Sequence, residues 1–178
     1  MDPETQAILS STQIALAAVK RQRYFDTERG FQAQFYTALH GHLETAGVLI
    51  ARRILEAEHQ KSEHIHNMKQ RPDVILHVPR LDTGNPARDG NVAVWQLKRN
   101  AAKEKALEDF EKIDDLIENL SYRVGVFINI SSSQHHWEAY GGNHRKRLFA
   151  FSTRLVYGNV ELGWSPNASR FLDPTESR

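Results

Sequence analysis

The segment that most restricts the possible folds runs from residue 101 to residue 130. Between 101 and 120 the apolar residues repeat on one stripe of a helix, while charged residues fill the other positions. That stripe consists of Leu107, Phe110, Ile113, Ile117 and Leu120. Residues 123–130 then form a nearly unbroken apolar run bounded by polar turns, which is typical of a central strand covered on both faces. The two patterns together predict an α/β chain in which helices pack on a sheet.

Further helices and strands are predicted on both sides of this segment. Helical spacing indicates one helix over residues 6–22 and a second that starts after Asp26 or Thr27, either of which offers an N-cap, and ends near 46. Short apolar runs predict the other strands, over residues 47–55, 71–78, 91–98 and 147–157, the last within a C-terminal strand region that reaches 164. Residues 79–90 are rich in Gly and Pro and predict a long hairpin loop.

Composition limits the class of protein. With 178 residues, of which 40% are hydrophobic, the chain can bury one core, so we expect a single domain over residues 1–178. Because 23 Lys and Arg nearly cancel 22 Asp and Glu, a nucleic acid would have to be bound by a local basic patch. The absence of Cys excludes thiolate nucleophiles and fits a reducing compartment. Without a signal-like N-terminus or eighteen consecutive apolar residues, we expect a cytoplasmic chain outside the membrane.

Three polar residues are expected to meet on one face of two neighbouring strands. The side-chain period of two puts Gln96 and Lys98 on the same face of the strand predicted over 91–98. If the preceding strand forms a hairpin with it, Asp73 stands beside that pair. Phosphodiester hydrolysis needs hard oxygen ligands for Mg²⁺ and a cation near the attacking water. Asp73 and Gln96 are therefore candidate ligands, and Lys98 is the candidate cation.

These residues resemble the PD-(D/E)xK nuclease superfamily, which has the restriction-endonuclease-like fold. The likeness lies in Pro72-Asp73 and Gln96-Leu97-Lys98, with a helix carrying Glu28 before them and another helix after them. It covers about residues 26–130. In that family the element order is helix, three antiparallel strands, helix, strand, and the same αβββαβ order is predicted for this chain.

The resemblance implies a role for each residue of the motif. Asp73 would bridge the metal, Gln96 would replace the usual second carboxylate, and the backbone carbonyl of Leu97 would add a ligand. Lys98 would position and activate the attacking water, and Glu28 would help to hold the metal or its water. The implied cofactor is Mg²⁺, for which Mn²⁺ can substitute. The implied activity is a nuclease, with DNA favoured over RNA as the substrate and with endonucleolytic cleavage expected.

Two features leave other functions open. The neutral amide of Gln96 binds Mg²⁺ less strongly than a carboxylate does, so a nucleic-acid-binding subunit of a larger complex, with a weakened site, is the second interpretation. Near-neutral charge favours a third, a protein-interaction domain. Glu28 is explained equally well as a first-turn acid favoured by the helix dipole. The pattern does not separate a monomer from a homodimer.

A group of basic residues is the candidate nucleic-acid surface. Arg145, Lys146 and Arg147 lie near several aromatic residues in the sequence, and Arg99 directly follows the motif. Cations beside aromatic rings suit contacts with a phosphate backbone and with bases. An ordinary solvated face explains the three consecutive residues equally well.

Other polar residues have simpler explanations. Asp109 and Lys112, three apart on a charged helix, are predicted to form a solvated ion pair. The histidines within residues 59–66 are expected to belong to a solvated polar segment, because their spacing is a weak zinc signal. Gln32 and Tyr36 follow the helix Glu at helical spacing, so they either share its face toward the cleft or form surface hydrogen bonds.

Overall fold

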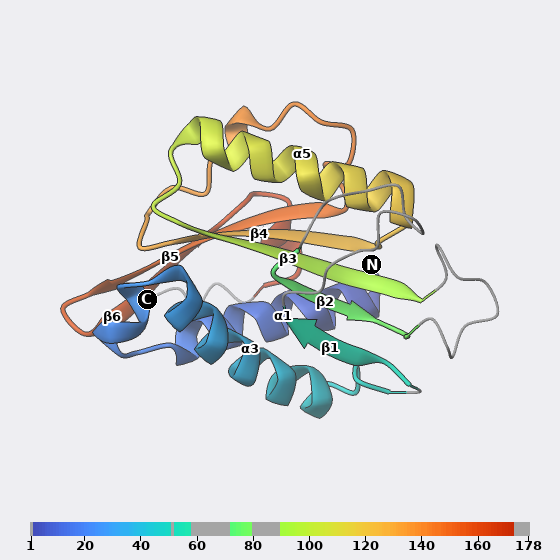
Figure 1. Ribbon diagram of the computed structural model, residues 1–178, viewed down its shortest axis with the longest axis horizontal. Coiled ribbons are helices and arrows are strands. Elements are labelled where there is room, and N and C mark those ends of the chain that lie inside the picture. Colours follow the sequence, from blue (N-terminus) through green and yellow to red (C-terminus); the bar gives the residue numbers. More distant parts are fainter. Residues whose placement is uncertain (1, 51, 58–71, 80–89, 173–178) are drawn as a thin grey trace.

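The computed structural model describes residues 2–50, 52–57, 72–79 and 90–172 of the chain. Within these residues the fold is α/β: a six-stranded mixed sheet has its strands in the order β1 to β6. Helices α1 and α3 lie on one face of the sheet and α5 lies on the other (Figure 1). Of the helices in these residues, none combines the length and the apolar character needed to cross a membrane.

The sheet changes from antiparallel to parallel and back. The helices are α1 (Pro3–Ala18), α2 (Gln22–Phe25), α3 (Glu28–Thr45) and α5 (Lys103–Leu120), with the 3-10 turns η2 (Trp137–Ala139) and η3 (Ala168–Arg170). The strands are β1 (Ile54–Ala57), β2 (Val74–His77), β3 (Asn91–Arg99), β4 (Val124–Ile130), β5 (Leu148–Val156) and β6 (Asn159–Trp164). β1, β2 and β3 form an antiparallel meander, whereas β3, β4 and β5 run parallel and β6 returns antiparallel to β5. Helix α5 makes the crossover between β3 and β4.

The elements with the strongest periodicity were predicted correctly. The helix expected over residues 101–120 is α5, whose apolar stripe is buried except for Leu107, which is partly buried. The strands expected over 91–98 and 123–130 are β3 and β4, and every residue of β4 is buried, as a strand covered on both faces requires. The helix expected over 6–22 instead begins at Pro3 and ends at Ala18.

The strand predicted over residues 47–55 is wrong for most of its length. Helix α3 ends at Thr45, and Gly47, which follows the C-cap Ala46, has a φ of +68°, the left-handed conformation that closes many helices. The backbone N–H of Val48 then donates to the carbonyl of Leu43 at 2.8 Å, and both side chains are buried. The apolar run after the glycine therefore belongs to the end of the helix, and β1 begins only at Ile54.

The two faces of β3 enter two different cores. Trp95 and Leu97 pack in the cluster formed with α1 and α3, whereas Val94 packs in the cluster formed with α5. Since side chains alternate along a strand, Gln96 and Lys98 project from the α5 face. This is the alternation that the sequence predicted, and it places the polar pair at the end of β3 under the first turns of α5.

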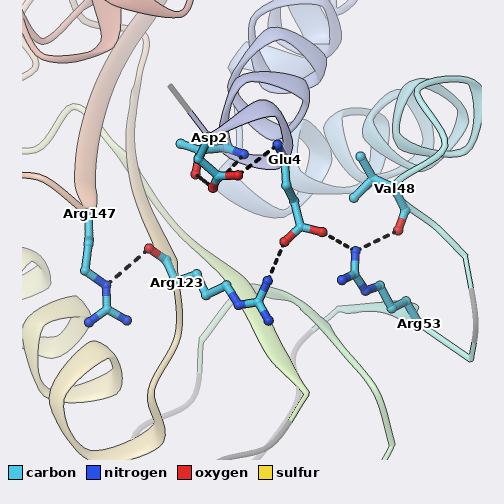
Figure 2. A network of polar contacts seen from close by, with 7 residues as sticks. Asp2, Glu4, Val48, Arg53, Arg123 and Arg147 are labelled. Atoms are coloured by element: carbon cyan, nitrogen blue, oxygen red, sulfur yellow. Dashed lines mark hydrogen bonds and ion pairs between the residues drawn. The ribbon is translucent and has the colours of Figure 1, made fainter.

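An ion-pair network joins the start of α1 to the segments that lead into β1 and β4. One carboxylate oxygen of Glu4 lies 2.5 Å from Arg53 Nη1, and the other lies 2.7 Å from Arg123 Nη1 (Figure 2). Arg53 also donates to the carbonyl of Val48 at 3.4 Å, and Arg147 donates to the carbonyl of Arg123 at 3.3 Å. Because Arg123 directly precedes β4, this network lies at the end of the sheet where the parallel strands begin.

Candidate active site

Asp73 lies directly before β2 and faces β3 at Gln96. Val74 pairs with Trp95, so the next step along the same register sets Asp73 opposite Gln96. Asp73 Oδ2 accepts the side-chain amide of Gln96 at 2.8 Å and the backbone N–H of Leu97 at 2.7 Å. The carboxylate is thus fixed by two donors from the strand that carries the rest of the motif.

The proline before Asp73 accounts for this geometry. A further step of the register sets Pro72 opposite Leu97, and proline has no N–H to donate to a neighbouring strand. The regular ladder therefore stops at Val74, and the Asp73 side chain takes the Leu97 N–H that a strand residue would otherwise bind. In an extended strand the N–H and C=O of one residue point toward the same neighbour, so the Leu97 carbonyl is also directed to this edge.

The helix α3 supports Asp73 from the opposite layer. Gln32 Nε2 donates to the backbone carbonyl of Asp73 at 3.0 Å, and the Tyr36 hydroxyl donates to the carbonyl of Leu55 in β1 at 2.7 Å. The two side chains that follow Glu28 at helical spacing therefore hold the backbones of β1 and β2. They also line an open cavity of about 420 Å³, together with residues of the same helix and Ala57.

Burial and like charge act on the Asp73 carboxyl together. Removal from water is the main cause that raises its pKa from 3.8 to about 6. The nearby carboxylates of Glu28 and Asp109 raise it further, while the Leu97 N–H and the Lys98 ammonium lower it. Asp73 therefore occupies a position where a negative charge is costly in the absence of a cation.

Glu28 and Lys98 meet at the end of β3. Helix α3 begins with Thr27 as its N-cap, whose hydroxyl accepts the Gly30 N–H at 3.0 Å, and this sets Glu28 in the first turn. Glu28 Oε2 accepts the backbone N–H of Arg99 at 3.0 Å, and Oε1 lies 3.8 Å from Lys98 Nζ. Both side chains are more than a third exposed, so the pair is open to solvent and to a ligand.

Of the predicted basic residues, only Arg99 lies beside this site. Its Nε donates to the carbonyl of Phe25 at 2.8 Å, so the end of β3 is joined to α2. Arg145 lies over the rings of Trp137 and Tyr140, with its guanidinium carbon 5.5 Å and 5.8 Å from their centroids.

Arg147 and Lys146 belong to the opposite end of the sheet. Arg147 donates to the carbonyls of Tyr122 and Arg123, just before β4 begins. Lys98 pairs in register with Asn129, near the end of β4. At the usual rise of a strand, Asn129 lies about 20 Å from Arg123, to which Arg147 donates. The structure therefore does not bring the segment 145–147 together with Asp73 and Lys98.

Asp109 is a functional candidate that the sequence interpretation missed. The expected ion pair with Lys112 is present, with Oδ1 2.5 Å from Lys112 Nζ, but its expected solvation is wrong for Asp109, which is only 2% exposed. A signal for its burial exists in the sequence: Ala106, Asp109, Ile113 and Leu116 follow one another at steps of three and four residues. The buried face of the helix was predicted from apolar residues alone, so Asp109 was not included in it.

The donor chemistry of the site fits a hard divalent cation. Among the described residues, no group of three or more His, Cys, Asp and Glu side chains is arranged to hold a metal. The oxygens available at the end of β3 are of mixed kind: the Asp73 carboxylate, the Gln96 amide and the Leu97 carbonyl, with Glu28 beside them. Such oxygen donors suit Mg²⁺, which usually keeps several waters in its coordination shell. The polar segment predicted for the histidines within 59–66 lies outside the described residues, as does most of the loop predicted over 79–90.

Comparison with known proteins assigns no family to the chain. No family model matches it, and no curated protein or solved structure matches it. The functional assignment therefore rests on the side chains and their arrangement.

Proposed function

We propose that this chain is a Mg²⁺-dependent nuclease of the PD-(D/E)xK type that hydrolyses phosphodiester bonds, with DNA as the favoured substrate. The observation that carries the proposal is the meeting of Asp73, Gln96 and Lys98 on one face, where β2 begins beside the end of β3. Glu28 completes the group through its contacts with Lys98 and with the backbone of Arg99. A carboxylate, two neutral oxygens and an ammonium at one sheet edge are the groups that this hydrolysis requires.

The order of the elements around the site supports the same proposal. Helix α3 is followed by the antiparallel strands β1, β2 and β3, and α5 then leads to β4, which is parallel to β3. This corresponds to the helix, three strands, helix, strand order expected of the restriction-endonuclease-like fold. In this interpretation α1 and the β5–β6 hairpin are additions at the two ends of the core.

Each residue of the motif has a role that follows from its position. Asp73, the Gln96 amide oxygen and the Leu97 carbonyl would hold Mg²⁺, which polarises the phosphate and readies a water when it is bound. The water oxygen would form a bond to phosphorus as one phosphorus–oxygen ester bond breaks, and the leaving oxygen would take up a proton in exchange for the one that the water releases. Lys98 orients that water and stabilises the negative charge that develops on the phosphate oxygens. Glu28 holds the Lys98 ammonium in place and can accept a hydrogen bond from the water.

Cleavage of a supercoiled plasmid in Mg²⁺, in Mn²⁺ and in EDTA tests the proposal. We expect nicked and linear products with either metal, and none with EDTA or with the variant Asp73→Asn. Glu111→Gln, which removes one exposed carboxylate of α5, is the matched control and should cleave as the wild type does. An intact plasmid with the wild-type chain in both metals contradicts the proposal.

One observation favours a second candidate function, a nucleic-acid-binding subunit with a weakened site. The Gln96 amide donates its N–H to Asp73, a contact that satisfies the carboxylate without any metal. This candidate predicts DNA binding that is independent of metal, with no cleavage, and binding that Lys98→Ala leaves unchanged. The plasmid assay and a binding assay in EDTA separate the two functions.

A further inference from the structure

A carboxylate oxygen without a partner lies buried next to the candidate site. Asp109 projects from α5 and is only 2% exposed. Its Oδ1 is paired with Lys112 Nζ at 2.5 Å, but in the described part of the chain its Oδ2 has no hydrogen-bond partner. An ionised oxygen removed from water without a partner is costly, so such an atom calls for a ligand that the protein itself does not supply.

The position of Asp109 connects this oxygen with the proposed metal site. Phe110, the next residue of α5, packs on Phe127 with ring centroids 4.9 Å apart, and Phe127 pairs in register with Gln96. Asp109 is therefore on the turn of α5 that covers the α5 face of β3, from which Gln96 projects. The carboxylates of Asp109 and Asp73 also act on each other electrostatically. The two acids thus come from two layers of the fold, Asp73 from the sheet and Asp109 from the helix that covers it.

We infer that Asp109 supplies the second carboxylate of the divalent-cation site, in the place of the one that Gln96 lacks. This inference rests on the proposed function. With Gln96 alone, the strand pair offers a single negative charge from Asp73, whereas a bound Mg²⁺ is better neutralised by two. Asp109 restores the second charge from α5, and the cation in turn provides the missing partner of its Oδ2.

The ion pair with Lys112 does not account for Asp109 by itself. The Lys112 side chain is 46% exposed and contacts only one of the two carboxylate oxygens. A purely structural ion pair does not require one partner to be fully buried with its other oxygen unsatisfied. Lys112 instead orients the carboxylate through Oδ1, so that Oδ2 remains available.

Mn²⁺ binding, measured by calorimetry and by electron paramagnetic resonance of the free ion, tests the inference without any assay of activity. We expect Asp109→Asn to weaken Mn²⁺ binding by at least about ten-fold, the effect of losing a charged ligand. The matched control is Glu108→Gln, which removes the same charge one residue earlier from an exposed position and should bind as the wild type does. Unchanged affinity in Asp109→Asn overturns the inference.

A rescue separates a ligand from a structural residue. In Gln96→Glu/Asp109→Asn the carboxylate is moved from α5 back to β3, so we expect Mn²⁺ affinity to return close to that of the wild type. If Asp109 only stabilises the fold, the double variant stays as weak as Asp109→Asn, and the inference is overturned. Urea unfolding in EDTA verifies that each variant is folded.

A measurement on the wild-type chain covers the case in which Asp109→Asn does not fold. With aspartate labelled by ¹³C at the side-chain carboxyl, Mg²⁺ should shift the resonances of both Asp73 and Asp109. A shift of Asp73 alone overturns the inference and leaves the proposed function standing. If the wild type binds no Mn²⁺ and neither resonance moves, the proposed function itself fails, so the two failures are distinguishable.

Discussion

The Asp73 side chain takes the place of a backbone acceptor for Leu97, because its Oδ2 accepts the Leu97 N–H at 2.7 Å where the β2–β3 ladder ends. This one contact explains why a proline and an aspartate stand together before β2. The proline ends the ladder, and the aspartate enters the vacated position with its charge directed to the edge where Gln96 and Lys98 project. The end of the backbone pairing at the proline therefore also places Asp73 in the candidate site.

The stability of the metal-free chain should fall as the pH rises from about 4 to about 6. Folding raises the pKa of Asp73 from 3.8 to about 6, so between these values the folded chain binds more protons than the unfolded chain. The free energy of unfolding then decreases with pH and levels off above pH 6. Two pKa units correspond to about 2–3 kcal/mol from this one residue.

Asp73→Asn should remove that loss, because an amide cannot ionise. In EDTA we expect the variant to gain about 2 kcal/mol on the wild type between pH 4 and pH 7.5. Urea unfolding at several pH values measures this difference. Adding Mg²⁺ at pH 7.5 should then stabilise the wild type and not the variant. A constant difference between the two chains across this pH range would show that Asp73 is not responsible.

Lys98→Ala should slow cleavage strongly with little change in metal binding. In the proposed mechanism the ammonium orients the water and stabilises developing charge, so its removal lowers the cleavage rate by about 10² to 10⁴-fold. Lys105→Ala is the matched control, since Lys105 is an exposed lysine on α5 that pairs with Glu108. Single-turnover cleavage beside Mn²⁺ calorimetry gives both quantities. Wild-type cleavage by Lys98→Ala would remove this residue from the mechanism.

The sequence was sufficient to predict how the residues of the candidate site are arranged wherever the signal is local. The period of a strand fixes which of the β3 side chains share a face, and a hairpin with the preceding strand sets Asp73 beside them, so the sequence alone predicts that Asp73, Gln96 and Lys98 meet. The strongly amphipathic α5 was predicted for the same reason. These features depend on neighbours in the chain and not on distant packing.

The features that the sequence did not reveal depend on contacts between layers. The burial of Asp109 follows from α5 lying against the sheet, whereas charge alone suggested a solvated residue. Its place in a basic segment made Arg147 a candidate for nucleic-acid binding, whereas in the structure its guanidinium donates to two backbone carbonyls just before β4. The run after Gly47 has the apolar residues of a strand, yet a backbone conformation at that one glycine assigns it to a helix end.

Gly125→Ala should destabilise the fold at the contact between α5 and β4. A Cβ added at Gly125 would lie 2.2 Å from Ile113 Cγ2 and 3.1 Å from Ile117 Cδ1, so α5 would have to move away from the sheet. Overpacking of this kind costs about 1–3 kcal/mol. Gly141→Ala is the control, because its Cβ would meet nothing within 4 Å. Urea unfolding of both variants gives the comparison.

The same contact offers a second test through coupling. Ile113→Ala removes the atom that the new Cβ would strike, so Gly125→Ala should cost much less in that background than in the wild type. Equal losses in the two backgrounds would show that the α5 contact does not set the requirement for glycine.

Arg99 and Arg147 should differ in their effect on DNA binding. Arg99 is exposed at the end of β3, next to the candidate site, whereas Arg147 lies at the other end of the parallel strands and donates to the carbonyls of Tyr122 and Arg123. We expect Arg99→Gln to weaken DNA binding and to reduce the slope of log affinity against log salt by about 1. Arg147→Gln should leave that slope unchanged and lower the stability of the chain.

Fluorescence anisotropy with a labelled duplex in EDTA, at several salt concentrations, measures both slopes. If Arg147→Gln reduces the slope and Arg99→Gln does not, DNA binds at the end of the sheet opposite to Asp73.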